Sequence, residues 1–209
     1  MQNKILLWTS LLVVIAAIIS YFYFDLPVAI FFYSLKNGFI NKGFKIITKL
    51  GTGGWILIPS FLIFISFRRN KKTLAQRALY LLSVVAISGI IVDIIKVIAG
   101  RFRPKVYFRE GLYGFDFFHI DYQYLSFPSG HSSTALSAMV AFGIFWPKFR
   151  IYFLFAGIVI ALSRVIINSH YLSDVLIGSL IGVLTSILLH HLYFKEKIDR
   201  AKQSIDSAE

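Results

Sequence analysis

Long apolar runs separated by short polar segments dominate the pattern of this 209-residue chain. Six of these runs approach the roughly 20 residues that a helix needs to cross a lipid bilayer. They cover residues 5–24, 51–67, 79–99, 131–146, 151–167 and 172–194. The pattern therefore predicts an all-α, integral membrane protein, a six-helix transmembrane bundle that forms one domain over residues 1–194.

The segments outside these runs carry predictions of their own. Residues 36–50 place apolar side chains at near-helical spacing among lysines, which predicts a basic helix lying in the membrane interface. A solvated connector is the alternative. Residues 100–127 form a long polar and aromatic loop, and residues 195–209 a charged cytoplasmic tail. No small-residue cleavage site follows the first run, so we expect a retained anchor and not a signal peptide.

Composition supports a membrane protein and excludes several other classes. Hydrophobic residues make up 57% of the chain, compared with about 45–50% in soluble domains. Cysteine is absent, which excludes disulfides and Cys-ligated metals. The net charge of +12 is scattered between the apolar runs, as expected for contacts with lipid phosphates and for topology signals. We therefore expect the lipid bilayer as a partner, and no nucleic acid.

The distribution of basic residues predicts the orientation. With a cytoplasmic N-terminus, 12 of the 22 Lys and Arg residues fall on the inside. Several of the other 10 have a chemical explanation, given below, and setting them aside restores the positive-inside bias. The prediction is a multi-pass protein with both termini in the cytoplasm and the 100–127 loop outside.

Three short motifs fall at the outer ends of the predicted spans, where alternating helices bring them to one face. They are Lys96 with Arg103-Pro104, then Pro128-Ser129-Gly130-His131, and finally Ser163-Arg164 with His170 and Asp174. A lone charge at such a place is usually an interface anchor, and an ion pair with Asp93 is an alternative for Lys96. Each ionisable group costs about 2.5–3.5 kcal/mol near the membrane centre, so their accumulation at one face predicts a function.

The cations and the helix start among these residues suit a phosphate group. Lys96, Arg103 and Arg164 supply positive charge, and a guanidinium matches phosphate oxygens in geometry. Ser129 and Gly130 lie where a helix begins, so free N–H groups there also favour an anion. We predict a phosphate cradle.

The two histidines have different surroundings. His170 and Asp174 are four residues apart, so a helix starting at His170 would let the carboxylate hold the imidazole in one tautomer. Such an imidazole is a nucleophile or a base. His131 lies at a helix N-terminus, where a bound phosphate would favour its protonation and make it an acid for the leaving alkoxide.

These three motifs resemble the signature of the type 2 phosphatidic acid phosphatase superfamily, the metal-independent lipid phosphate phosphatases. The resemblance implies that His170 attacks phosphorus and forms a phosphohistidine, that Asp174 orients it, and that His131 protonates the leaving group. It also implies that the phosphoryl oxygens are held by Lys96, Arg103, Ser129, Gly130 and Arg164. Neither a metal nor another cofactor is expected.

The expected function is thus hydrolysis of a membrane lipid phosphate in a bacterial cytoplasmic (inner) membrane, with the site facing the periplasm or cell exterior. Candidate substrates are phosphatidylglycerol phosphate, undecaprenyl diphosphate, phosphatidic acid and lipid A phosphates. Arg101, Lys105 and Arg109 add positive charge beside the cradle and suggest a second phosphate or a large anionic head group, or attraction to the lipid surface. A lipid phosphotransferase and, more remotely, a lipid transporter are the alternatives.

Overall fold

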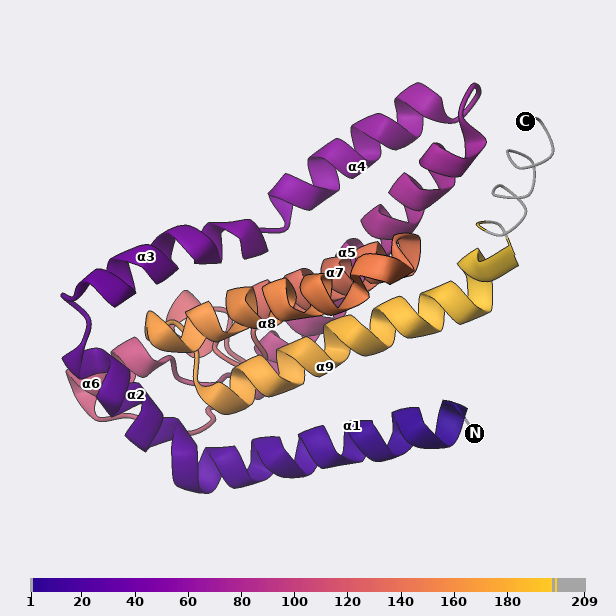
Figure 1. The fold of residues 1–209 in the computed structure, drawn as a ribbon. Coiled ribbons are helices and arrows are strands. Elements are labelled where there is room, and N and C mark those ends of the chain that lie inside the picture. The colour runs from indigo at the N-terminus through magenta and orange to yellow at the C-terminus, as the bar shows by residue number, and fades with distance from the viewer. Residues whose placement is uncertain (1, 197, 199–209) are drawn as a thin grey trace.

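The computed structural model describes residues 2–196 and 198 and consists of helices joined by loops (Figure 1). The α-helices are α1 (Gln2–Ile19), α2 (Asp25–Ser34), α3 (Phe39–Ile47), α4 (Gly54–Phe67), α5 (Lys72–Ala99), α6 (Pro104–Glu110), α7 (Gly130–Phe145), α8 (Arg150–Ile166) and α9 (Leu172–Leu189). Within the described residues, strand-like pairing is limited to one bridge, between Arg101 and Phe115. The predicted all-α class is confirmed.

Five helical segments are long and apolar enough to cross a membrane: Lys4–Ser34, Phe39–Phe67, Lys72–Ala99, Pro147–Ile166 and Leu172–Phe194. Apolar side chains such as Trp8 and Trp55 point outward from them and are 62% and 73% exposed, as expected for lipid-facing surfaces. The predicted all-α membrane bundle is therefore present. The remaining predicted span corresponds to α7, which has only 16 residues, or about 24 Å of helix.

The first helical segment is longer than the predicted span of 5–24. A π-helical turn, Ser20–Phe24, connects α1 directly to α2. Pro27 does not end the helix because it lies in the first turn of α2, where a missing N–H is tolerated. Asp25 does not end it either, because its carboxylate is buried and hydrogen-bonded inside the protein.

The basic segment predicted over 36–50 contains α3, a 3₁₀ turn (Thr48–Gly51) and the connection to α4. Phe39 and Ile46 of this segment point outward, whereas Asn41 and Thr48 are buried against the bundle. Part of its apolar surface is thus directed away from the protein, whereas Ile47 packs against the core. A location in the membrane interface stays a prediction. The predicted tail, 195–209, lies outside the described residues except for 195, 196 and 198.

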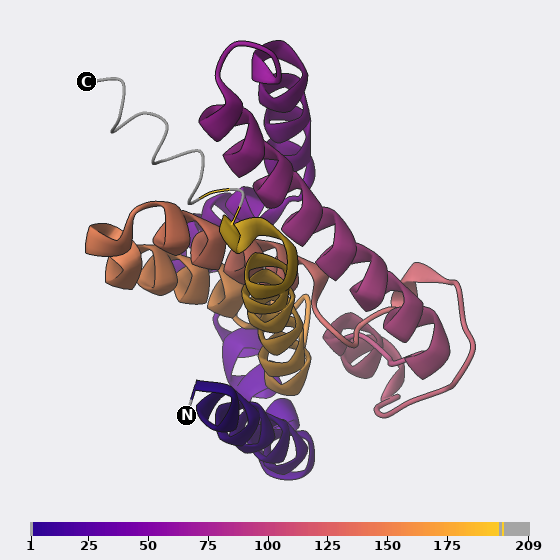
Figure 2. The same ribbon diagram turned by 90° about the vertical axis from the view of Figure 1, so that its right-hand side faces the viewer.

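Helix α7 lies at the centre of the bundle, between α5, α8 and α9 (Figures 1 and 2). Most of its side chains are small and buried, which lets neighbouring backbones approach closely. On α9, a Cβ added at Gly178 or Gly182 would lie 2.3 Å from the carbonyl oxygen of Ser129 or Ser133, respectively. Only glycine fits at these two positions.

Buried hydrogen bonds also connect the central helices. The Tyr80 hydroxyl of α5 donates to the Ser186 carbonyl of α9 at 2.8 Å, and the Ser186 hydroxyl donates to the Ser137 carbonyl of α7 at 2.7 Å. Polar side chains join membrane helices in this way because lipid offers no other partner. The helix ends that carry the three motifs are therefore held in fixed relative positions.

The predicted loop 100–127 is partly ordered by α6 and a 3₁₀ turn (Tyr122–Tyr124). It folds back beside the end of α5, where the N–H groups of Asp116 and Phe118 donate to Gly100 and Ile98 (Figure 2). This loop, the start of α7 and the α8–α9 connection meet at one end of the bundle (Figure 1).

We predict that Gly182→Ala destabilises the bundle, because the added methyl group meets backbone atoms of α7 that cannot move independently. Overpacking of this kind costs about 1–3 kcal/mol. Gly89→Ala is the matched control, since a Cβ there meets no atom within 4 Å. Thermal unfolding of the purified proteins in detergent measures the difference, and equal midpoints for the two variants would contradict the close α7–α9 packing.

Candidate active site

His170 lies in the short connection between α8 and α9 and is only 3% exposed. The connection turns sharply at Asn168, which has a positive φ of 53°. Asparagine tolerates this left-handed conformation better than most residues. The N–H groups of Ser169 and His170 then donate to the Arg164 carbonyl at 2.9 and 3.2 Å, so the end of α8 fixes the position of the imidazole.

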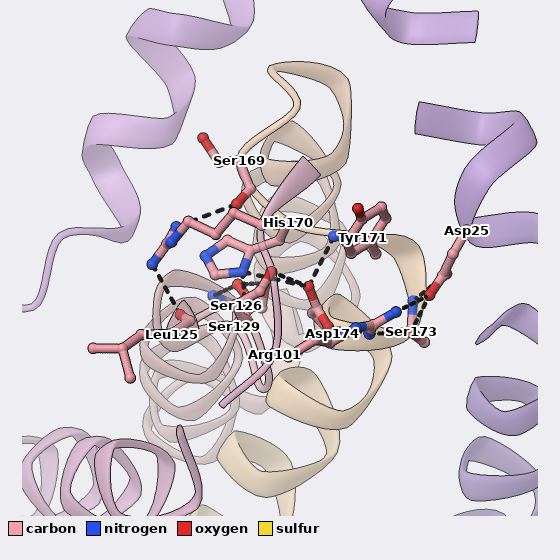
Figure 3. A network of polar contacts seen from close by, with 12 residues as sticks. Asp25, Arg101, Leu125, Ser126, Ser129, Ser169, His170, Tyr171, Ser173 and Asp174 are labelled. Atoms are coloured by element: carbon pink, nitrogen blue, oxygen red, sulfur yellow. Dashed lines mark hydrogen bonds and ion pairs between the residues drawn. The ribbon is translucent and has the colours of Figure 1, made fainter. Parts of the chain in front are cut away.

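A hydrogen bond to a backbone carbonyl fixes the tautomer of His170. Nδ1 lies 2.7 Å from the Ser126 carbonyl oxygen (Figure 3). Because a carbonyl only accepts, Nδ1 carries the hydrogen and Nε2 keeps its lone pair. Burial, together with the charges of Arg103 and Arg164, lowers the pKa of His170 to about 3. The imidazole is therefore neutral near pH 7 and nucleophilic at Nε2.

Asp174 supports His170 differently from the sequence-based expectation. Helix α9 begins at Leu172, so His170 precedes the helix, and its Nδ1 is 3.7 Å from Asp174 Oδ2, too far for a hydrogen bond. That oxygen instead accepts from the Tyr171 N–H at 2.9 Å and the Ser126 hydroxyl at 2.6 Å. Asp174 thus holds Ser126, whose carbonyl orients the imidazole of His170.

The other oxygen of Asp174 accepts a hydrogen bond from Arg101, whose side chain is fully buried. Arg101 also pairs with Asp25 of α2, with Nη2 and Oδ2 separated by 2.7 Å (Figure 3). Asp25 in turn accepts from the Ser173 N–H at 2.9 Å and the Ser20 hydroxyl at 2.7 Å. An Asp25–Arg101–Asp174 chain therefore connects α2 to the site.

Arg101 consequently does not add free positive charge beside the cradle. Burial alone would lower its pKa, but the charges of Asp174 and Asp25 outweigh this and raise the pKa above its usual value. Aromatic rings also enclose the guanidinium, with centroids 4.7 Å away for Tyr171 and 5.0 Å away for Tyr21. Arg101 is therefore a buried structural cation whose charge is offset by two carboxylates.

Arg103, by contrast, is held by neutral groups. Its guanidinium donates to the carbonyl oxygens of Tyr122, Leu125 and Ser169 at 2.8, 2.9 and 3.2 Å. Burial lowers its pKa. Because carbonyls fix the orientation without cancelling the charge, Arg103 can attract an anion.

The other two predicted cations approach the same place from α8 and α5. Arg164 is 7% exposed, and its Nη1 donates to the Thr48 hydroxyl at 2.9 Å. Lys96 pairs with Asp93 at 3.3 Å, as the alternative for this residue supposed. Its ammonium nevertheless lies beside the start of α7, since a Cβ added at Gly130 would be 3.2 Å from Lys96 Nζ.

The start of α7 supplies His131 and part of the predicted cradle. Ser129 caps the helix: its hydroxyl accepts from the Ser132 N–H at 3.4 Å, and its own N–H donates to the Asp174 carbonyl at 3.0 Å. The first-turn N–H groups of Gly130 and His131 have no acceptor within the helix. The 3₁₀ turn that carries Gly51 lies against the His131 backbone.

The structure therefore gathers the predicted residues at one end of the bundle. They are Lys96, Arg103, Ser129, Gly130, His131, Arg164, His170 and Asp174. A neutral imidazole beside Arg103 and Arg164, which neutral carbonyl and hydroxyl groups hold, suits nucleophilic attack on an anionic phosphoryl group. The roles of the individual residues stay predictions.

Sequence reasoning missed three residues that build this arrangement, Asp25, Thr48 and Ser126, and it gave Arg101 a different role from the one it has in the structure. Asp25 was detectable in principle, because it directly follows an apolar run of membrane length, and a charge near lipid usually has a partner. Thr48 and Ser126 carry no comparable pattern. Their roles depend on a long-range fold that brings them to Arg164 and Asp174.

We predict that Arg101→Met strongly destabilises the protein, because Asp25 and Asp174 would then be buried without a counter-charge. Breaking a buried ion pair costs about 3–5 kcal/mol. Adding Asp25→Asn should recover part of this loss, so that the double variant is less destabilised than the sum of the two single variants. Unfolding in detergent gives the coupling, with Arg109→Met, which removes an exposed arginine, as the control. Additive effects would contradict the buried chain.

We also predict that His170 does not titrate between pH 5 and 8, since its pKa is lowered to about 3 and the group charges only below that value. NMR of the ¹⁵N-histidine-labelled protein should show a neutral imidazole protonated at Nδ1 across this range. The His170→Ala protein identifies the signal by its loss. A midpoint near the ordinary value of about 6.5 would contradict the buried geometry.

Comparison with known proteins places these features in a family. The sequence model of the PAP2 superfamily matches residues 77–198. The lipid A 1-phosphatase of Rhizobium etli is 30% identical over 190 residues, covering 85% of this chain and 81% of the relative. The lipid A 1-phosphatase of Rhizobium johnstonii is 30% identical over 185 residues, covering 83% of this chain and 75% of the relative. Lipid phosphate phosphatase 1 of Arabidopsis thaliana is 27% identical over 170 residues, covering 66% and 52%.

A solved structure agrees with the fold. The crystal structure of the transmembrane PAP2-type phosphatidylglycerolphosphate phosphatase of Bacillus subtilis superposes with a TM-score of 0.62. It covers 92% of this chain and 95% of its own, at 24% identity, and so supports the fold alone. Because the superfamily model spans more than half of the chain and contains all three predicted motifs, this protein belongs to the PAP2 superfamily, as its sequence predicts.

Proposed function

We propose that this protein removes a phosphate group from a membrane lipid through a phosphohistidine formed on His170. The enzyme class predicted from the sequence, a membrane lipid phosphatase, is confirmed by the superfamily match and by relatives of that activity. The observation that carries the mechanism is the neutral imidazole of His170, held by the Ser126 carbonyl beside Arg103 and Arg164.

The first step transfers the phosphoryl group to the enzyme. The Nε2 lone pair of His170 attacks phosphorus, a P–N bond forms, and the P–O bond to the lipid breaks. Nδ1–H stays bonded to the Ser126 carbonyl and stabilises the positive charge that develops on the ring. His131, protonated beside the bound phosphate, gives its proton to the leaving alkoxide.

The second step releases phosphate. Water attacks phosphorus, His131 accepts a proton from it, and the P–N bond breaks to return neutral His170. Throughout, the phosphoryl oxygens contact a set of cations and helix-start groups that offset their charge. This set comprises Lys96, Arg103, Ser129, Gly130 and Arg164.

The proposal extends to the location of the site relative to the membrane. In this proposal α7 is the sixth span, although short, because it is surrounded by three longer helices and begins at the same end of the bundle as the site. The site end faces the periplasm or cell exterior, and both termini face the cytoplasm of a bacterium. The basic cluster between α4 and α5 then lies inside, as the positive-inside rule expects.

The substrate is a lipid phosphomonoester or diphosphate. The relatives and the solved structure suggest lipid A 1-phosphate and phosphatidylglycerol phosphate as the first lipids to test. Phosphatidic acid and undecaprenyl diphosphate complete the panel. Transfer of the phosphoryl group from His170 to a second lipid is the alternative reaction, and it would yield a phosphorylated acceptor in place of free phosphate.

We predict phosphate release from at least one of these lipids by the purified protein in detergent, and its persistence in excess EDTA. His170→Ala should abolish release, because the nucleophile is lost. His131→Ala should reduce release by about 10²–10⁴-fold, the usual contribution of a general acid or base. Release that EDTA abolishes would contradict the metal-independent mechanism, and unchanged release by His170→Ala would contradict the site assignment.

The leaving group separates the roles of the two histidines. The nitrophenolate of a nitrophenyl phosphate leaves without a proton, so we predict that this substrate restores the first step in His131→Ala but not in His170→Ala. A burst of nitrophenol and an acid-labile, alkali-stable phosphoprotein should accompany this step. A phosphoprotein in the His170→Ala protein would show that another residue is the nucleophile.

A further inference from the structure

A cavity of about 320 Å³ lies beside the candidate active site. Its lining residues belong to the end of α2, the turn that follows, α3, α6 and the α8–α9 connection. Its volume is at the lower end of the range of small-molecule sites, about 300–1,000 Å³. The cavity is thus large enough for a polar group but not for a lipid chain.

The cavity and the site share a wall. Ser169 lines the cavity, precedes His170 in the chain, and accepts from Arg103 through its carbonyl at 3.2 Å. Lys105 also lines the cavity and follows Arg103 by two residues. Consecutive Cα atoms are only about 3.8 Å apart, so the lining residues Ser169 and Lys105 lie close to His170 and Arg103. A single substrate can therefore extend from the active site to the cavity.

Charge in the cavity has one sign. Lys36, Lys45 and Lys105 line it, and no Asp or Glu is among its lining residues. The ammonium of Lys36 lies 4.0 Å from the ring centroid of Tyr33, and that ring stacks on Phe108 at 3.8 Å. These contacts hold one wall in place. The cavity therefore favours an anion.

A buried acceptor adds a second requirement. Asn41 is 4% exposed, and its Nδ2 donates to the Ile166 carbonyl at 3.2 Å. Its Oδ1 has no hydrogen-bond partner among the described residues, although a buried polar atom is costly to leave unpaired. Since Asn41 lines the cavity, a hydroxyl group next to the anionic group of a ligand would supply the partner that Oδ1 lacks.

We propose that this lysine cavity binds a second anionic, hydroxyl-bearing group of the lipid whose phosphate reacts at His170. This inference rests on the proposed function and narrows its substrate to lipids with two anionic groups in the head. Attraction of the lysines to anionic lipid at the membrane surface is the competing account. Binding in the cavity predicts that only the lysines lining it affect binding of the substrate. Surface attraction predicts that neighbouring lysines outside the cavity have the same effect.

The experiment compares two variants with the same loss of charge on the same side of the protein. Lys36→Gln/Lys45→Gln neutralises two of the three cavity lysines. Lys42→Gln/Lys49→Gln neutralises two other exposed lysines of the same segment, which do not line the cavity. Both are assayed in nonionic detergent with phosphatidic acid, which has one phosphate, and phosphatidylglycerol phosphate, which has two phosphates and a hydroxyl group.

For the cavity variant, we expect KM for phosphatidylglycerol phosphate to rise about tenfold, the effect of losing one well-placed ionic contact, with kcat retained. For phosphatidic acid, kcat/KM should stay within about twofold. The control variant should show neither change. Equal losses with both lipids or in both variants would instead assign the lysines to surface attraction, and no change in either variant would exclude the cavity as a binding site.

Equilibrium binding separates this inference from the proposed reaction. The His170→Ala protein should bind phosphatidylglycerol phosphate about tenfold more tightly than its cavity-variant derivative does, while the two should bind phosphatidic acid alike. This measurement needs no turnover. A wild-type protein without phosphatase activity but with this binding difference would overturn the proposed reaction and keep the cavity, whereas equal binding would overturn the cavity alone.

Discussion

The positive charge of Arg101 has to be balanced inside the protein, because its side chain is fully buried. Asp25 and Asp174 provide that balance from α2 and α9, which are far apart in the sequence. An unpaired charge in such a place would cost several kcal/mol, so the three residues specify one another's positions. Since Asp174 also holds Ser126, the orientation of His170 depends on this ionic chain.

Two kinds of packing keep the Asp25–Arg101–Asp174 chain of ion pairs in place. Along α9, Gly178 and Gly182 allow the backbone to contact the start of α7, so that the Ser129 N–H reaches the Asp174 carbonyl. Around Arg101, aromatic rings exclude water and strengthen the charge interactions. The site is therefore polar at its centre and apolar around it. The arginines that remain for a substrate, Arg103 and Arg164, are those that the fold holds through neutral carbonyl and hydroxyl groups.

Sequence reasoning succeeded where local pattern and chemistry coincide. Apolar runs located most helices, and the three motifs selected the residues that meet at one end of the bundle, because their chemistry is unusual at a membrane boundary. It failed where a residue's role depends on a distant partner. Asp25 looked like the polar end of a span, but a π turn and Arg101 keep it inside a continuous helix. The spacing of His170 and Asp174 suggested a direct bond, but α9 starts too late for one and the Ser126 carbonyl takes that place.

The position of Asp25 has a consequence for how PAP2 proteins can be compared and recombined. The superfamily match covers residues 77–198, whereas Asp25 lies well before it, in the first helical segment. The functional unit of this chain therefore extends beyond the region by which the family is recognised. A chimaera that exchanged the first helices between relatives would separate Asp25 from Arg101, so the two residues have to be inherited, or exchanged, together.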